Sequence, residues 1–257
     1  MKIEPIPAFS DNYIWALHVG KSNIWVVDPG DAKPVEQYLA SHELKLDGIL
    51  ITHHHADHTG GITSLCATRK IPVYGPDSRI QGITDRLADG DQIQIGDIRI
   101  TVLAVPGHTL DHLAYVLEMA GQSPVLFCGD TLFAGGCGRL FEGTAAMMYT
   151  SLLRLGALPA DTLVYCTHEY TLSNLRFALK AEPDNLELID RYQRELDKRE
   201  RNLPTLPSTI LLEQRTNPFL RCHTASIKAN IGQIMAQSLQ SDDIETFASL
   251  RRWKDSA

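Results

Sequence analysis

Residues 52–61, THHHADHTGG, place four of the chain's ten histidines and an aspartate within six positions, directly after an apolar run that ends in Ile-Leu-Ile. Imidazoles this close together repel when protonated and need hydrogen-bond partners when neutral. A histidine-rich surface loop is one explanation. A metal ion is the better one, because it binds the neutral nitrogens directly. The stretch therefore indicates a metal site where the chain turns at the end of a strand.

The spacing of the candidate ligands supports metal binding. His53 and His55 are two residues apart, and the period of two along a strand points both imidazoles to one face. The chain then turns, which brings Asp57 and His58 back toward the same place. His54 faces away on this alternation. Nitrogen and carboxylate oxygen ligands at these separations suit zinc, iron or manganese.

Three more ligand-type residues follow predicted strands: His108 in AVPGHTLDH, Asp130 in LFCGDTLF and His168 in VYCTHEY. Layered α/β scaffolds collect reactive side chains at strand ends. A lone histidine there is more often structural, but beside the cluster both become candidate ligands. Asp28, at the end of the strand in VVDPG, is a candidate to orient a ligand imidazole through its carboxylate. The remaining histidines are expected to be structural or exposed: His18, His42, His54, His112 and His223.

Seven candidate ligands exceed the four of a tetrahedral zinc site, and two divalent ions explain the number. The expected division is three ligands for each ion and one shared carboxylate: His53, His55 and His108; Asp57, His58 and His168; and Asp130 as the bridge. A water between the ions would become acidic enough to supply hydroxide near neutral pH. The metal that we expect is zinc, with iron or manganese as alternatives.

The first two-thirds of the chain is rich in strand patterns. Apolar runs joined by GKSN predict a hairpin over residues 12–30, and alternation around Gly96-Asp97 predicts another over 91–107. Further strands are expected at 46–53, 112–119, 124–130 and 162–170. Helical patterns lie between them at 34–44, 62–69 and 144–155. This mixture predicts an α/β (α+β) fold in which helices cover sheets.

The hydrophobic pattern of the sequence changes from strand-like to helical after His168. Helical periodicity covers 171–181, 186–201, 224–238 and 242–253, and no strand is expected. We therefore predict a catalytic domain over residues 1–168 and a helical domain over residues 169–257.

The composition narrows the class of protein. A 44% hydrophobic and 21% charged chain of 257 residues can bury a sizeable core, and the net charge of −7 disfavours nucleic acid as a partner. Five widely spaced cysteines predict free thiols rather than a disulfide framework. No apolar stretch is long enough to span a membrane. We expect a soluble, cytoplasmic, monomeric protein with a small-molecule substrate and no nucleic-acid or membrane partner.

The HxHxDH pattern, followed by single His, Asp and His residues at strand ends, resembles the metallo-β-lactamase superfamily. That resemblance implies an αβ/βα four-layer sandwich with a dinuclear metal site. The segments GDTLFAGGCGRLFEGT, THEYTLSNLRFA, NPFLR and RRWK further resemble the hydroxyacylglutathione hydrolase (glyoxalase II) family from end to end, including its C-terminal helical domain. This family hydrolyses S-D-lactoylglutathione to D-lactate and glutathione, the second step of methylglyoxal detoxification.

The resemblance also implies a set of glutathione contacts: Arg139, Phe141, Tyr170, Arg251 and Lys254, with Asn174 close by. Arg139 stands where lysine is frequent in the family, and Phe141 stands where tyrosine often supplies a hydroxyl. Cations suit the two carboxylates of glutathione. Two simpler explanations stay open, since Arg251 and Lys254 also suit a helix C-terminus, and Tyr170 also suits a half-buried packing position.

The expected reaction is attack of a metal-bridging hydroxide on the thioester carbonyl. A thiolate leaves readily, so no strong general acid is needed. Asp57 and Asp130 take part as metal ligands. The alternatives are a mononuclear iron glutathione persulfide dioxygenase of the same superfamily, a nuclease, and a metal-binding module without activity.

Overall fold

The computed structural model describes residues 1–76, 80–235 and 242–256. The chain forms two compact units that interleave along the sequence. Unit 1 comprises residues 1–104, 111–129 and 165–168, and unit 2 comprises residues 105–110, 130–164 and 169–257. The predicted division into a catalytic and a helical domain after residue 168 stays a prediction.

The first sheet of unit 1 has six strands in sequence order: β1 (Lys2–Ala8), β2 (Asn12–His18), β3 (Asn23–Val27), β4 (Lys45–Leu50), β5 (Val73–Gly75) and β6 (Asp85–Arg86). The pairs β1–β2 and β2–β3 are antiparallel, which confirms the first predicted hairpin. From β3 to β6 the pairing is parallel. The polar loops that follow β3 and β4 therefore leave the same edge of the sheet.

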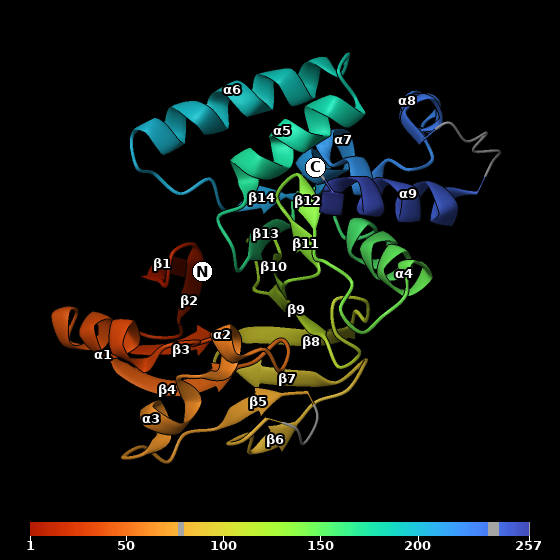
Figure 1. Ribbon diagram of the computed structural model, residues 1–257. Helices are drawn as coiled ribbons and strands as arrows, with labels where there is room; N and C mark the ends of the chain where they lie inside the picture. The colour runs from red at the N-terminus through yellow and green to blue at the C-terminus, as the bar shows by residue number, and fades with distance from the viewer. Residues whose placement is uncertain (77–79, 236–241, 257) are drawn as a thin grey trace. The chain divides into compact units, whose positions relative to one another are not determined.

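Two helices of unit 1 pack against this sheet (Figure 1). α1 (Ala32–Ser41) begins where the Asp31 carboxylate accepts a hydrogen bond from the Lys33 backbone N–H at 2.9 Å. α3 (Ile62–Cys66) follows the single turn of α2 (Ala56–Thr59). Apolar side chains of α1 and α3 join the buried sheet residues in one core, which fixes the loop between β4 and α3.

The second sheet of unit 1 contains β7 (Gln92–Ile95), β8 (Ile98–Ala104), β9 (Leu113–Glu118) and β10 (Val125–Gly129), all antiparallel. The β7–β8 turn falls at Gly96-Asp97, as predicted. Aromatic side chains fill the interior of the unit: the Trp15 ring lies 4.8 Å from that of Tyr165, and Tyr165 lies 5.6 Å from Phe127. The Trp15 indole N–H donates to the Cys166 carbonyl at 3.0 Å, so its polar end is satisfied.

Unit 2 is mainly helical. Its helices are α4 (Ala145–Gly156), α5 (Thr171–Ala181), α6 (Leu186–Glu200), α7 (Ile210–Thr216), η1 (Pro218–Leu220), α8 (Ala225–Met235) and α9 (Asp243–Ser256). It also holds the short hairpin of β11 (Leu132–Phe133) and β12 (Gly136–Cys137). β13 (Leu163–Cys166) begins in this unit, where it pairs with β14 (Ser208–Thr209).

Aromatic rings hold the helices of unit 2 together. Phe219 lies between two partners, with ring centroids 6.2 Å from Phe177 on α5 and 5.7 Å from Phe247 on α9. Phe177 also meets Trp253 of α9 edge-on at 4.8 Å, and Tyr149 of α4 lies 5.7 Å from Phe247. The core of unit 2 therefore places α9 beside α4 and α5.

The predicted mixture of strands and helices is confirmed, with corrections. β14 contradicts the expectation that no strand follows His168. Several other elements were not expected: β1, β5, β6, β11, β12, α2, α7 and η1. β14 has two residues and α7 has seven, so neither is long enough to show a clear period. The predicted helix at 224–238 extends beyond Met235 into residues outside the described ones. In the described part of the chain, none of the helices has the length and apolar character needed to cross a bilayer.

Candidate active site

The histidine cluster lies in unit 1, in the extended segment between β4 and α2. β4 ends at Leu50, so His53 and His55 follow the strand rather than end it. His53 is fully buried, and its Nε2 atom lies 3.1 Å from Nδ1 of His55. The two imidazoles therefore lie together, as their spacing predicts.

Asp28 connects the ends of β3 and β4. Its backbone has φ of +52°, a left-handed conformation that turns the carboxylate inward, and the residue is 2% exposed. One oxygen accepts from the Thr52 backbone N–H at 2.7 Å. The other lies 2.9 Å from Nδ1 of His58 and 2.7 Å from the Thr52 hydroxyl. The Asp28 carboxylate therefore contacts the candidate ligand His58 at its Nδ1 atom.

Asp57, His58 and His168 converge within unit 1. The Asp57 Oδ2 atom lies 3.5 Å from Nε2 of His58 and 3.5 Å from Nε2 of His168. The Nδ1 atom of His168 lies 2.7 Å from Oδ1 of Asp11. Asn12 donates to Asp57 Oδ2 at 3.1 Å, which fixes the carboxylate.

This group of three side chains fits a divalent cation. The three ligand atoms all lie within 4.8 Å of one another. Each imidazole contacts a carboxylate through Nδ1, so its Nε2 atom is the nitrogen that lies toward the Asp57 carboxylate. Two imidazole nitrogens and a carboxylate oxygen gathered in this way suit a divalent cation. The sequence did not single out Asp11 or Asn12, whose available signal is a DN pair in which Asn12 begins β2 and Asp11 precedes it.

The other two candidate ligands lie in unit 2. The His108 Nε2 atom is 3.6 Å from Oδ2 of Asp130, and His108 Nδ1 donates to the Arg139 carbonyl at 2.8 Å. Gly138 permits this geometry, because a Cβ atom there would lie 2.0 Å from the Asp130 carbonyl oxygen and 3.1 Å from His108 Nδ1. Both residues are buried, and His108 is held through Nδ1 by a backbone carbonyl rather than by a carboxylate.

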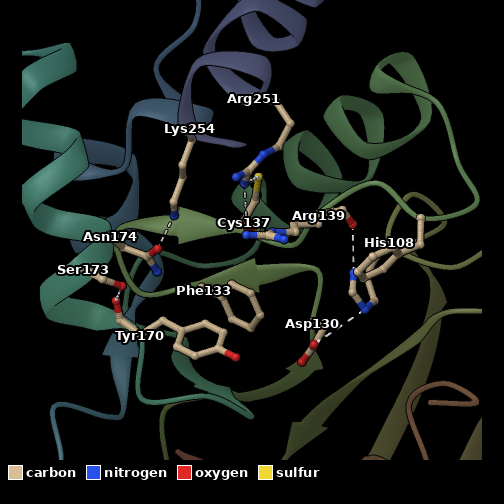
Figure 2. Close-up of a pocket in the computed structure, with 11 residues that line it drawn as sticks. His108, Asp130, Phe133, Cys137, Arg139, Tyr170, Ser173, Asn174, Arg251 and Lys254 are labelled. Atoms are coloured by element: carbon tan, nitrogen blue, oxygen red, sulfur yellow. Dashed lines mark hydrogen bonds and ion pairs between the residues drawn. The ribbon is translucent and has the colours of Figure 1, made fainter. Parts of the chain in front are cut away.

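A cavity of about 500 Å³ opens beside His108 and Asp130 in unit 2 (Figure 2). All six predicted substrate contacts line it: Arg139, Phe141, Tyr170, Asn174, Arg251 and Lys254. The sequence missed three further lining residues: Phe133, Cys137 and Ser173. Phe133 and Cys137 lie within the glycine-rich segment GDTLFAGGCGRLFEGT, and its resemblance to the family was the feature that could have indicated them as lining residues.

The cations of the cavity have different surroundings. Arg139 is 69% exposed at its side chain. Arg251 is 4% exposed and donates to the Cys137 carbonyl at 3.0 Å and to Asp255 at 2.8 Å. Lys254 donates to the Asn174 side-chain oxygen, and its ammonium lies 5.8 Å from the Phe177 ring centroid. The Arg251 guanidinium is thus hydrogen-bonded to other residues of the protein, while the Arg139 guanidinium remains accessible to solvent.

Burial sets the proton affinities inside the cavity. It lowers the pKa of Lys254 to about 8, and the neighbouring charge of Arg251 acts in the same direction. Burial also raises the pKa of the Cys137 thiol, which therefore stays protonated near neutral pH. The cavity combines two arginines, one easily deprotonated lysine and a neutral thiol, a combination that favours an anionic ligand.

Two of the histidines expected to be structural or exposed, His54 and His112, have protein partners in unit 1. His54 Nδ1 lies 2.9 Å from an Asp111 oxygen. His112 is fully buried, stacks on His53 with centroids 4.6 Å apart, and has its Nδ1 atom 3.0 Å from the Leu113 carbonyl.

Known proteins match the whole of this chain. Residues 11–168 match the model of the metallo-beta-lactamase superfamily, and residues 169–257 match the model described as the hydroxyacylglutathione hydrolase C-terminus. The hydroxyacylglutathione hydrolase of Hahella chejuensis is 50% identical over 255 residues, with 99% of this chain and 98% of that protein covered. That of Pseudomonas aeruginosa strain LESB58 is 52% identical over 258 residues, with 99% of each covered. The chain belongs to the hydroxyacylglutathione hydrolase family.

Membership in this family confirms the predicted resemblance, both in the superfamily region and in the C-terminal helical region. The fold prediction is confirmed by solved structures as well. ETHE1 from Myxococcus xanthus superimposes with a TM-score of 0.65 at 24% identity, and the match covers 100% of this chain and 99% of that one. At this identity the likeness concerns the metallo-β-lactamase fold alone.

Proposed function

We propose that this chain is a metal-dependent hydrolase that cleaves the thioester of S-D-lactoylglutathione into D-lactate and glutathione. The observation that carries the proposal is the identity of 50–52% over 99% of the chain with hydroxyacylglutathione hydrolases. That similarity includes the helical region, so it reaches beyond the metal-binding half. The persulfide dioxygenase alternative loses support because this high identity is to hydroxyacylglutathione hydrolases along almost the whole chain.

We propose two divalent ions, held by the seven predicted ligands: His53, His55, His58, His108 and His168, with Asp57 and Asp130. Zinc is the metal that we favour, although iron and manganese accept the same ligand atoms. When bound, such ions polarise a carbonyl and make water a nucleophile near neutral pH. The convergence of Asp57, His58 and His168 in unit 1 supports the second set of ligands.

The residues of the chain prepare the site for this chemistry. Asp28 and Asp11 hold the outer nitrogens of His58 and His168, so the inner nitrogens keep their lone pairs for the metal. Asn12 keeps one Asp57 oxygen in place. Asp57 and Asp130 therefore serve as ligands rather than as proton acceptors.

The substrate's glutathione part is proposed to occupy the cavity of unit 2. Arg139 is accessible to a carboxylate, and Lys254 with Asn174 offers donors on the opposite wall (Figure 2). Tyr170, whose ring meets Phe133 edge-on at 5.4 Å, and Phe141 add apolar contact area. Arg251 contributes its charge while its guanidinium holds the protein backbone. The thiolate of glutathione is a good leaving group, so the cavity needs no strong acid.

We further propose a monomeric, cytoplasmic enzyme with no nucleic-acid partner. The net charge of −7 and the five free cysteines support this. We also retain the division into a catalytic domain, residues 1–168, and a substrate-binding helical domain, residues 169–257. It is supported by the two family models, which meet at this position.

The test measures bound metals per chain and cleavage of S-D-lactoylglutathione in one preparation. Two metals per chain and rapid cleavage that a chelator abolishes are expected. An Asp130→Ala variant should lose metal together with activity, whereas a normal metal content would remove Asp130 from the ligands. One iron per chain, with oxygen uptake on glutathione persulfide and no thioester cleavage, would establish the dioxygenase instead.

A further inference from the structure

A short hairpin forms one wall of the cavity. β11 and β12 contribute two residues each, with Leu132 opposite Cys137 and Phe133 opposite Gly136. Two-residue strands do not maintain a conformation by their own hydrogen bonds. Phe133 and Cys137 nevertheless face the cavity, so something else fixes the hairpin.

Side chains from three helices bind the hairpin backbone. Asn217, just after α7, donates to the Phe133 carbonyl at 3.2 Å and to the Gly136 carbonyl at 2.9 Å. Glu213 of α7 accepts from the Gly135 N–H at 2.8 Å. Asn174 of α5 donates to the Ala134 carbonyl at 3.1 Å, and Arg251 of α9 binds the Cys137 carbonyl. These contacts hold every residue from 133 to 137.

Glu213 is the centre of this arrangement. It is completely buried, as is Arg191 of α6 at 1% exposure, and Arg191 Nη2 donates to Glu213 Oε1 at 2.6 Å. The other oxygen, Oε2, accepts from Gly135 and, at 3.0 Å, from Asn217. Oε1 of Glu213 thus binds α6 through Arg191, and Oε2 binds the hairpin that forms the cavity wall.

A buried ion pair is weak evidence for stability, because desolvation offsets much of its attraction. The Arg191–Glu213 pair matters here because of where it holds the hairpin. Four donors surround the carboxylate, from Arg191, Ser208, Gly135 and Asn217, and only an ionised carboxylate accepts from all of them. The hairpin is therefore fixed relative to α6 and α7 by a group that is not among the residues lining the cavity.

We infer that Glu213, held by Arg191, is a positioning residue that sets the substrate-binding wall of the cavity through the β11–β12 hairpin. Gly135 and Gly136 make the contact possible, because Gly135 has φ of +68° and a Cβ at Gly136 would lie 2.6 Å from the Asn174 Cγ atom. The inference deepens the proposed function and rests on it, since it assigns Glu213 a part in binding the glutathione thioester.

The test is Glu213→Gln, which preserves shape but must turn an NH₂ group toward two of the four donors. We expect KM for S-D-lactoylglutathione to rise roughly tenfold while kcat and metal content stay near wild type, since misplacement of a contact by a fraction of an ångström has effects of this order. An unchanged KM would overturn the inference, as would loss of metal.

Glu182→Gln is the matched control. Glu182 is 5% exposed and pairs with Arg221 through two bonds of 2.8 Å in the same unit, yet these bonds do not involve the hairpin. Both substitutions should lower the melting temperature, but only Glu213→Gln should change KM. Equal effects of the two variants on KM would mean general destabilisation and would overturn the inference.

A second variant covers the case in which Glu213→Gln does not fold. Asn217→Asp keeps the oxygen that accepts from the Phe219 N–H at 3.1 Å but loses the donors to the hairpin carbonyls. The same rise in KM is expected, and a wild-type KM would overturn the inference. Calorimetric binding of glutathione separates this inference from the proposed function. If the wild type binds glutathione without cleaving the thioester, the function fails, and weaker binding by the variants still supports Glu213. A wild type that neither binds glutathione nor cleaves the thioester would overturn both.

Discussion

The Nδ1 atom of His58 lies 2.9 Å from the Oδ2 atom of Asp28, and both side chains are buried, at 0% and 2% exposure. Asp28 itself is held by the backbone N–H and the hydroxyl of Thr52. The end of β3 therefore determines the orientation of an imidazole that is about thirty residues away in sequence.

Asp28→Asn should weaken metal binding. An amide lacks the negative charge that makes His58 a better ligand, so we expect metal affinity to fall by about ten- to a hundredfold. Competition with a chelator, followed by metal analysis, measures the change directly. Asp97→Asn, which makes the same change in the exposed β7–β8 turn, is the control. Equal affinities of the two variants would contradict a role for Asp28 in orienting His58.

Substrate affinity should depend on pH through Lys254. Burial lowers the pKa of this ammonium from its ordinary 10.5 to about 8. An anionic substrate binds the protonated form better, so KM should rise as pH increases through about 8. The same titration has the opposite effect on stability. The unfolded chain keeps the Lys254 proton up to a higher pH than the folded chain does, so the free energy of unfolding increases from about pH 8 up to the ordinary pKa of lysine.

Lys254→Arg tests this assignment, because arginine stays charged throughout the range. The measurement is KM for the glutathione thioester between about pH 7 and pH 9.5, corrected for spontaneous hydrolysis, a range that spans the titration of Lys254. The wild-type KM should rise at the alkaline end while that of the arginine variant stays flat. A parallel rise in both proteins would assign the titration to another group.

Asp255 competes with the substrate for the cations of the cavity. Its Oδ1 atom lies 2.8 Å from Arg251 Nη2 and 3.7 Å from Arg139 Nε. Asp255→Asn should free Arg139 and lower KM by up to about fivefold, the equivalent of roughly 1 kcal/mol for a partly exposed pair. Glu245→Gln removes the same charge from the exposed first turn of α9 and should leave KM unchanged. A higher KM for Asp255→Asn would show that Asp255 organises the cations instead.

The sequence predicts those parts of the fold that repeat locally. Alternating residues around Gly96-Asp97 correctly predict the β7–β8 hairpin, and the 3.6-residue period correctly predicts α5 and α6. The histidine spacing likewise predicts that His53 and His55 lie together. Each of these features depends on neighbours within a few residues, so a single sequence contains the necessary information.

The remaining features depend on partners that are distant in sequence. Glu213 lies on α7, which is too short for a clear period, and Asn217 lies just after it. Their contacts with Gly135 and Gly136 span about eighty residues. Asp11 contacts His168 across 157 positions. An isolated acidic or amide residue has no local pattern that indicates such a partner, so these roles become visible only in the folded chain.

Phe141→Tyr should restore a contact that this chain lacks. The Phe141 ring is 64% exposed at the cavity and lies 5.2 Å from the His108 ring, so a hydroxyl can be added without overpacking. One new hydrogen bond to the glutathione part should lower KM by about two- to tenfold with little change in kcat. A lactoyl thioester of a small thiol without the glutathione peptide serves as the control, and its KM should not change. If the tyrosine improves both substrates equally, the hydroxyl acts near the thioester, and the assignment of position 141 to glutathione binding is wrong.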